Sequence, residues 1–97
     1  MNKDKLVEIS KNLRKDIIET INKAGSGHPG GSLSIIDILS YLYFEKMNID
    51  VSNPKYEERD RFVLSKGHAA PALYVTLAEK GFFDKEELNV MVMILMI

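Results

Sequence analysis

The chain has 97 residues, which is enough for one small domain or for part of a larger one. Its hydrophobic content of 45% and charged content of 28% are typical of a globular protein and exclude a wholly disordered chain. The net charge of −1 provides no general positive field for nucleic acid or an anionic membrane, so any anion binding has to be local.

The absence of cysteine excludes a disulfide framework, a thiolate nucleophile and a zinc–sulfur site. A chain of this kind is suited to a reducing cytoplasm. The first residues mix charged and apolar side chains instead of forming an apolar signal core. We therefore expect no export signal and a cytoplasmic location.

A first helix is predicted from Leu6 to Ala24. Its apolar residues recur at spacings of three and four, which places them in one stripe along a helix, and Gly25 is well placed to end it. Such a stripe usually faces a protein core, so we assign it no chemistry. The stripe consists of Leu6, Ile9, Leu13, Ile17, Ile21 and Ala24.

The segment from Lys23 to Ser34 contains four of the six glycines and one of the two histidines. Pro29 disfavours a helical conformation at His28, so this loop is predicted to present the His28 imidazole to a small ligand. A plain turn is the alternative, although a turn rarely needs so many glycines. The glycine spacing also resembles two nucleotide-binding motifs. We reject both, because the segment follows a helical pattern and has Gly31 where a phosphate loop needs lysine.

A second helix is predicted from Ser34 to about Met47. Ser34 and Asp37 resemble a capping box, and the apolar residues that follow cover a broad surface, so this helix should be largely buried. If its N-terminus faces the glycine-rich loop, its free amides add a positive pole beside His28.

The charged segment from Asn48 to Asp60 is predicted to be a surface connection. Phe62 to Leu64 then predicts a short buried strand, and a third helix should begin near Pro71 and end at Gly81. His68 would stand where the strand ends and the helix begins, which is the usual anion-binding corner of an open α/β sheet. A structural, hydrogen-bonded role is the alternative for His68, and two histidines without a third ligand argue against a metal site.

Near the end of the chain, Asp84 and Glu87 form a second capping-box pattern and predict a helix. The pattern then changes to eight apolar residues, Val90 to Ile97, which is far below the ~20 that a membrane-spanning helix needs. We interpret this tail as the result of truncation or a frameshift, with a partner-docking tail as the alternative.

Two segments together resemble the start of transketolase, the thiamine diphosphate enzyme of the pentose phosphate pathway. They are Ser26-Gly27-His28-Pro29-Gly30-Gly31-Ser32-Leu33 and Asp60-Arg61-Phe62-Val63-Leu64-Ser65-Lys66-Gly67-His68-Ala69. The likeness extends from about Leu6 to Leu88. It implies an α/β thiamine diphosphate-binding fold, of which this chain holds a mostly helical part with one short strand. Residues 1–88 would be the N-terminal part of that domain, and 89–97 an aberrant apolar tail.

The resemblance implies transfer of a two-carbon ketol unit from a ketose phosphate to an aldose phosphate. By position in the motifs, His28 is similar to the histidine that contacts substrate hydroxyls and assists proton transfer, and His68 to the one that contacts the cofactor near its diphosphate. The implied cofactors are thiamine diphosphate and Mg²⁺. The metal-binding Gly-Asp-Gly segment and its asparagine are absent from this sequence, so no residue is assigned to the metal.

The resemblance also implies sugar phosphate substrates and a homo-oligomer or an assembly with a C-terminal subunit, without nucleic acid or membrane partners. We expect the isolated chain to be inactive, because the metal anchor is missing. Two alternatives are a non-catalytic interaction module and a related enzyme such as a dihydroxyacetone synthase or a deoxyxylulose phosphate synthase. The Ser-Gly-His-Pro-Gly form favours transketolase over the last of these.

Overall fold

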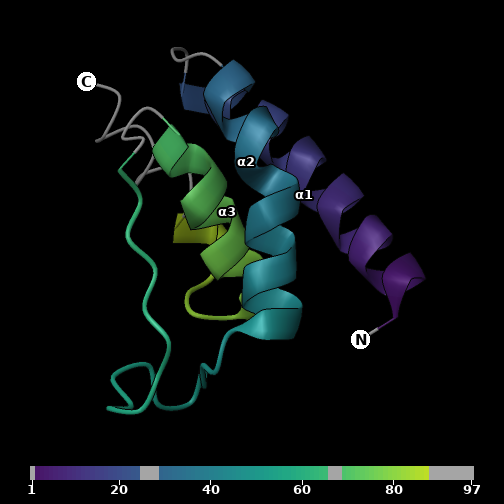
Figure 1. Cartoon of the computed structure of the whole chain (residues 1–97). Helices are drawn as coiled ribbons and strands as arrows, with labels where there is room; N and C mark the ends of the chain where they lie inside the picture. Colours follow the sequence, from purple (N-terminus) through teal and green to yellow (C-terminus); the bar gives the residue numbers. More distant parts are fainter. Residues whose placement is uncertain (1, 25–28, 66–68, 88–97) are drawn as a thin grey trace.

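The computed structural model describes residues 2–24, 29–65 and 69–87. Within these ranges three α-helices pack against one another: α1 (Lys3–Ala24), α2 (Pro29–Tyr41) and α3 (Ala70–Lys80) (Figure 1). A π-helical turn, η1 (Leu42–Lys46), continues α2, and a 3₁₀ turn, η3 (Lys85–Glu87), follows α3. Figure 1 shows α2 and α3 starting at the same end of the molecule, where α1 ends.

The prediction for α1 is confirmed, and the helix begins three residues earlier than expected. Asn2 supplies the reason, because its side-chain Oδ1 accepts a hydrogen bond from the Lys5 amide at 2.8 Å. This bond satisfies one of the free amides in the first turn. Leu13 and Ile17 of the predicted stripe are fully buried, so the stripe does face the core.

The predicted start of α2 at Ser34 is wrong, since the helix begins at Pro29. Proline is favoured in a first helical turn because its missing N–H would have no partner there. Ser34 does not cap the helix: its hydroxyl donates to the Gly31 carbonyl one turn back, at 2.9 Å. Asp37 instead pairs with Arg14 of α1, with 2.7 Å between Oδ1 and Nη2. Packing against α1 and α3 outweighs the low helix propensity of the two glycines that follow Pro29.

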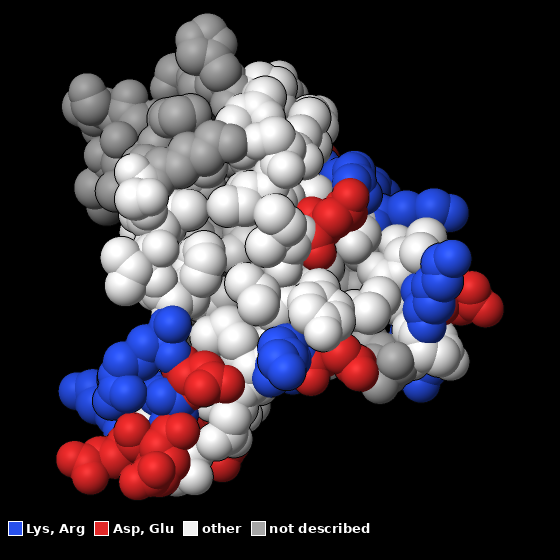
Figure 2. All heavy atoms as spheres, in the orientation of Figure 1, with Lys and Arg blue, Asp and Glu red and all other residues white. Residues whose placement is uncertain are grey.

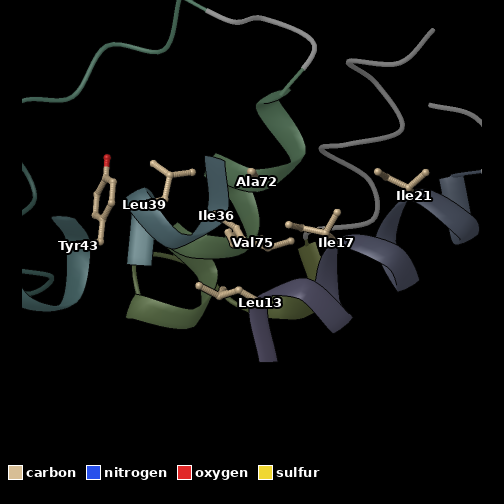
Figure 3. Packing of buried hydrophobic residues seen from close by; sticks show 8 residues of the cluster. All are labelled: Leu13, Ile17, Ile21, Ile36, Leu39, Tyr43, Ala72 and Val75. Atoms are coloured by element: carbon tan, nitrogen blue, oxygen red, sulfur yellow. The ribbon is translucent and has the colours of Figure 1, made fainter. Parts of the chain in front are cut away.

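The core lies between the three helices, and each contributes to it (Figure 3). The side chains converge from helix faces whose apolar positions are three or four residues apart, as expected for packed amphipathic helices. The cluster consists of Leu13, Ile17 and Ile21 from α1, Ile36 and Leu39 from α2, Tyr43 from η1, and Ala72 and Val75 from α3.

The predicted strand from Phe62 to Leu64 is not seen. Among the described residues the chain runs as an extended trace here (Figure 1) but forms no strand with another segment, and Val63 is 86% exposed. Phe62 nevertheless packs on the core and meets the Tyr43 ring edge to face at 6.1 Å between centroids. The three apolar residues therefore encode an extended conformation, but a strand also needs a partner backbone. The described part of the chain is mostly helical, as predicted.

The connection from Asn48 to Asp60 lies on the surface, as predicted, and carries a mixed group of charges (Figure 2). Its two ends are tied together, because the Asn48 amide donates to Asp60 Oδ2 at 2.7 Å and the Asp60 amide donates to the Asn48 carbonyl at 2.8 Å. Inside it, Ser52 donates to Asp50 through its hydroxyl and its amide, and these bonds lower the pKa of Asp50.

The third helix begins and ends as predicted. Gly81 follows α3 with φ of 107° in the left-handed region, and its amide donates to the carbonyls of Leu77 and Ala78. Glycine adopts this conformation without the strain that a Cβ would add. The helix predicted from Asp84 onward is, within the described residues, a single 3₁₀ turn. The remainder of that segment and the apolar tail lie outside the described residues.

Lys85 joins η3 to the helices, since its Nζ lies 3.2 Å from Asp16 Oδ2 and also contacts Glu79. The hydrogen bond to Glu79 is the main cause that raises the pKa of Lys85 above its usual 10.5. We expect Lys85→Met to lower the free energy of unfolding by about 1 kcal/mol at neutral pH, as for a half-exposed ion-pair network.

The pH dependence of this effect follows from the raised pKa. A group whose pKa is raised by folding contributes fully to stability at pH values below its pKa in the unfolded chain. This contribution is lost as the pH rises through its pKa in the folded chain. Urea unfolding of wild type and Lys85→Met should therefore converge above pH 10.5. Lys55→Met, in the exposed connection, is the matched control and should differ little from wild type at any pH. A gap between wild type and Lys85→Met that stays constant with pH would contradict the assignment.

Candidate functional site

The two predicted site residues, His28 and His68, lie outside the described residues, but the residues that flank them are placed. His28 directly precedes Pro29, the first residue of α2. His68 is followed by Ala69, the N-cap of α3. Chain connectivity therefore ties each histidine to the start of a helix.

The helices α2 and α3 start at the same end of the molecule and pack against each other (Figure 1). Neither helix has an acidic residue in its first turn, and the Ala69 N-cap of α3 offers no side-chain hydrogen bond. The free amides and the positive end of each helix dipole are thus not neutralised by nearby carboxylates. On the face that Figure 2 shows, the described residues around the start of α3 are also uncharged. The arrangement suits an anionic group.

These features allow a test of the implied cofactors. Two helix ends without acidic residues fit the negative charge of a diphosphate. The described residues do not fit a magnesium site, because no group of three or more His, Asp or Glu side chains among them could hold a metal ion.

Ser32, in the first turn of α2, is a polar residue that the sequence analysis did not single out. It is fully buried, and its hydroxyl has no hydrogen-bond partner among the described residues. Ser32 shares a helix face with Ile36 and Leu39, at spacings of four and three. Its small size lets α2 pack closely, and we assign it no ligand. Ser32 belongs to the first of the two motif segments, but the predicted helix start at Ser34 left it outside the helix.

The described side chains whose pKa values are shifted lie away from these helix starts. Burial raises the pKa of Tyr43. Tyr43 lies in η1, which follows the end of α2 opposite to its start. Ser10 and Ser40 hydrogen-bond between α1 and α2 at 3.0 Å, and Ser40 also donates to the Ile36 carbonyl. These contacts hold helices together and carry no reactive group. No helix in the described ranges is long and apolar enough to cross a membrane.

Comparison with known families identifies the chain. The family model described as "Transketolase, thiamine diphosphate binding domain" matches residues 3–91. The chain belongs to this family. The match includes both histidines and all three helices. The transketolase resemblance drawn from the two motifs is thus confirmed.

Curated members of the transketolase family are similar to most of this chain. The 6-deoxy-6-sulfo-D-fructose transketolase subunit of a Clostridium species is 57% identical over 77 residues, which are 79% of this chain and 28% of that protein. The apulose-4-phosphate transketolase subunit of Phocaeicola vulgatus is 51% identical over 75% of this chain and 26% of its own length. Human transketolase is 43% identical over 86% of this chain and 13% of its own length. The chain therefore spans about a quarter or less of the relatives it matches.

Proposed function

We propose that this chain provides the N-terminal part of the cofactor-binding half of a transketolase. That enzyme transfers a two-carbon ketol unit from a ketose to an aldose. The observation that carries the proposal is that the helices following the two motif histidines start at one end of the molecule, without acidic residues in their first turns. The family match over residues 3–91 supports it.

The residues of this chain would bind and orient the cofactor and the substrate. Bound thiamine diphosphate supplies the electron sink that allows the carbon–carbon bond to break and form. The amides at the starts of α2 and α3 would favour the negative charge of its diphosphate. His68, two residues before α3, would donate a hydrogen bond to a phosphate oxygen, and His28, directly before α2, would exchange a proton with a substrate hydroxyl.

Magnesium would be held by residues other than the described ones, which offer no ligand cluster. For this reason we propose that the chain works only with the remainder of a transketolase, as a second polypeptide or as further sequence. Two relatives are named as transketolase subunits, which supports assembly with another subunit. The proposal includes a cytoplasmic location, to which a cysteine-free chain is suited.

The extended segment from Arg61 to Ser65 supports an α/β fold for the complete domain. Val63 is 86% exposed, and the segment borders a hollow of about 440 Å³ lined largely by apolar side chains such as Met47, Leu77 and Phe82. A second strand beside this segment would use its unpaired backbone groups and bury Val63. In the complete domain, we propose, this segment is one strand of a sheet.

The substrate class is a sugar with an anionic end. The names of the two bacterial subunits compared above specify a sulfonated ketose and a phosphorylated sugar. Both carry a charged group, so we propose a ketose phosphate, or its sulfonate counterpart, as donor and an aldose phosphate as acceptor.

A chimera tests the proposal. The matching 77 residues of the Clostridium subunit would be replaced by those of this chain, and ketol transfer would be assayed with the partner subunit, thiamine diphosphate and Mg²⁺. We expect activity within about tenfold of the parent, which corresponds to a loss of at most about 1.4 kcal/mol in transition-state stabilisation. The isolated 97-residue chain, the control, should show none. A folded, assembled chimera without activity would refute the proposal.

A further inference from the structure

A groove of about 410 Å³ runs between α1 and α2, at the half of the bundle away from the two histidine motifs. Leu6 and Val7 of α1 and Tyr41 of α2 provide its apolar lining. Val7 is 45% exposed and Tyr41 48% exposed, so the groove is open to solvent. Two further exposed apolar residues, Ile18 and Ile38, lie on the same two helices.

The groove has a positive rim. Lys3, Lys11 and Arg14 line it from α1, and the only acidic residue in its lining is Asp37. Arg14 and Asp37 neutralise each other at 2.7 Å, whereas neither lysine has an ion-pair partner among the described residues. Figure 2 shows Lys and Arg side chains along the α1 edge of the molecule, with some Asp and Glu side chains among them. The groove thus combines an apolar floor with two unpaired positive charges.

The spacing of the charges suggests the occupant. Lys3 and Lys11 lie eight residues apart on one helix, which corresponds to about 12 Å along its axis. A helix lying along the groove would match them with two carboxylates about two turns apart, and its apolar residues between these would contact Val7 and Tyr41. Opposite charges at the rim would fix its register.

We propose that the α1–α2 groove binds an amphipathic acidic helix of a partner polypeptide. This site is separate from the proposed cofactor end of the molecule, at which α2 and α3 start. Its recognition chemistry is apolar contact in the centre and two ion pairs at the ends.

The probe is a designed helical peptide with leucines on one face and two glutamates eight positions apart, and the protein is the full 97-residue chain. Fluorescence anisotropy should detect binding that weakens several-fold when salt rises from about 50 mM to about 500 mM. The double variant K3E/K11E should bind at least about tenfold more weakly, because attraction becomes repulsion at both ends. A peptide with lysines in place of the glutamates should regain affinity for this variant.

The matched control is K5E/K15E, which changes the net charge equally on the same helix but alters no residue that lines the groove. It should bind the acidic peptide like wild type. Val7→Glu should weaken the binding of both peptides, because it disrupts the apolar floor of the groove. Equal effects of the two double variants, or no binding of either peptide, would overturn the proposal. Self-association of the chain that K3E/K11E abolishes would also overturn it, in favour of a second copy as the occupant.

Discussion

Replacing Ile36 with alanine is expected to lower the free energy of unfolding by about 2–4 kcal/mol. Ile36 is fully buried on α2, in the cluster where all three helices meet (Figure 3). Removing its outer carbons leaves a cavity that rigid neighbours such as Ile17 and Val75 fill only in part. A chain of this size has a total stability of about 5–15 kcal/mol, so the variant would be partly unfolded at modest denaturant concentrations.

The helix itself offers the matched control. Ile38 is two residues further along α2 and 58% exposed, so Ile38→Ala removes the same atoms and changes helix propensity equally. It should change stability by no more than about 0.5 kcal/mol. Urea unfolding followed by far-ultraviolet circular dichroism measures both variants. Equal losses for the two would mean that the three helices do not share the core described above.

The helices were largely predictable because their signals are local. The apolar stripe of α1 and the Pro71 and Gly81 boundaries of α3 depend on spacing and backbone preference within one segment. The start of α2 was missed because the Ser34 and Asp37 pattern was interpreted as a cap. In the structure Asp37 pairs with Arg14, which is 23 residues away, and no local pattern encodes that contact.

The strand prediction failed for a related reason. Three apolar residues specify an extended conformation with alternating faces, and the structure has that conformation, with Phe62 packed inward and Val63 outward. Whether an extended segment becomes a strand depends on a second segment, which local sequence cannot supply. The α1–α2 groove was likewise invisible in the sequence, because its lining combines two helices that were considered separately.

The helices that flank the candidate site were predictable in part. The sequence predicted a helix start after each histidine motif. The structure has α3 beginning at Ala70, close to the predicted Pro71, whereas α2 begins at Pro29, before the predicted Ser34. That both starts lie at one end follows from tertiary packing of α2 along α3, which spacing alone does not determine. The roles of His28 and His68 stay predictions.

The largest effect on activity is expected for His28→Ala in the chimera that carries this chain's residues in the Clostridium subunit. General acid–base assistance by a positioned side chain contributes about 10²–10⁴-fold to a rate. We therefore expect kcat for ketol transfer to fall by at least about 100-fold. The thiamine diphosphate concentration needed for half-maximal activity should stay the same, because His28 is assigned to the substrate. Steady-state kinetics with varied donor and varied cofactor measure both quantities.

His68→Ala in the same chimera is the informative comparison, because it removes an identical side chain from the other motif. It should raise the cofactor concentration needed for half-maximal activity by about tenfold, because the loss of one hydrogen bond to a charged group weakens binding by about this factor. Saturating cofactor should restore most of kcat. The two variants thus separate a role in substrate chemistry from a role in cofactor binding, although both histidines precede helices that start at the same end of the bundle. If His28→Ala instead behaved like His68→Ala, with kcat recovered at high cofactor, the assignment of proton transfer to His28 would be wrong. A loss of assembly in either variant, visible by size-exclusion chromatography, would assign that histidine a structural role instead.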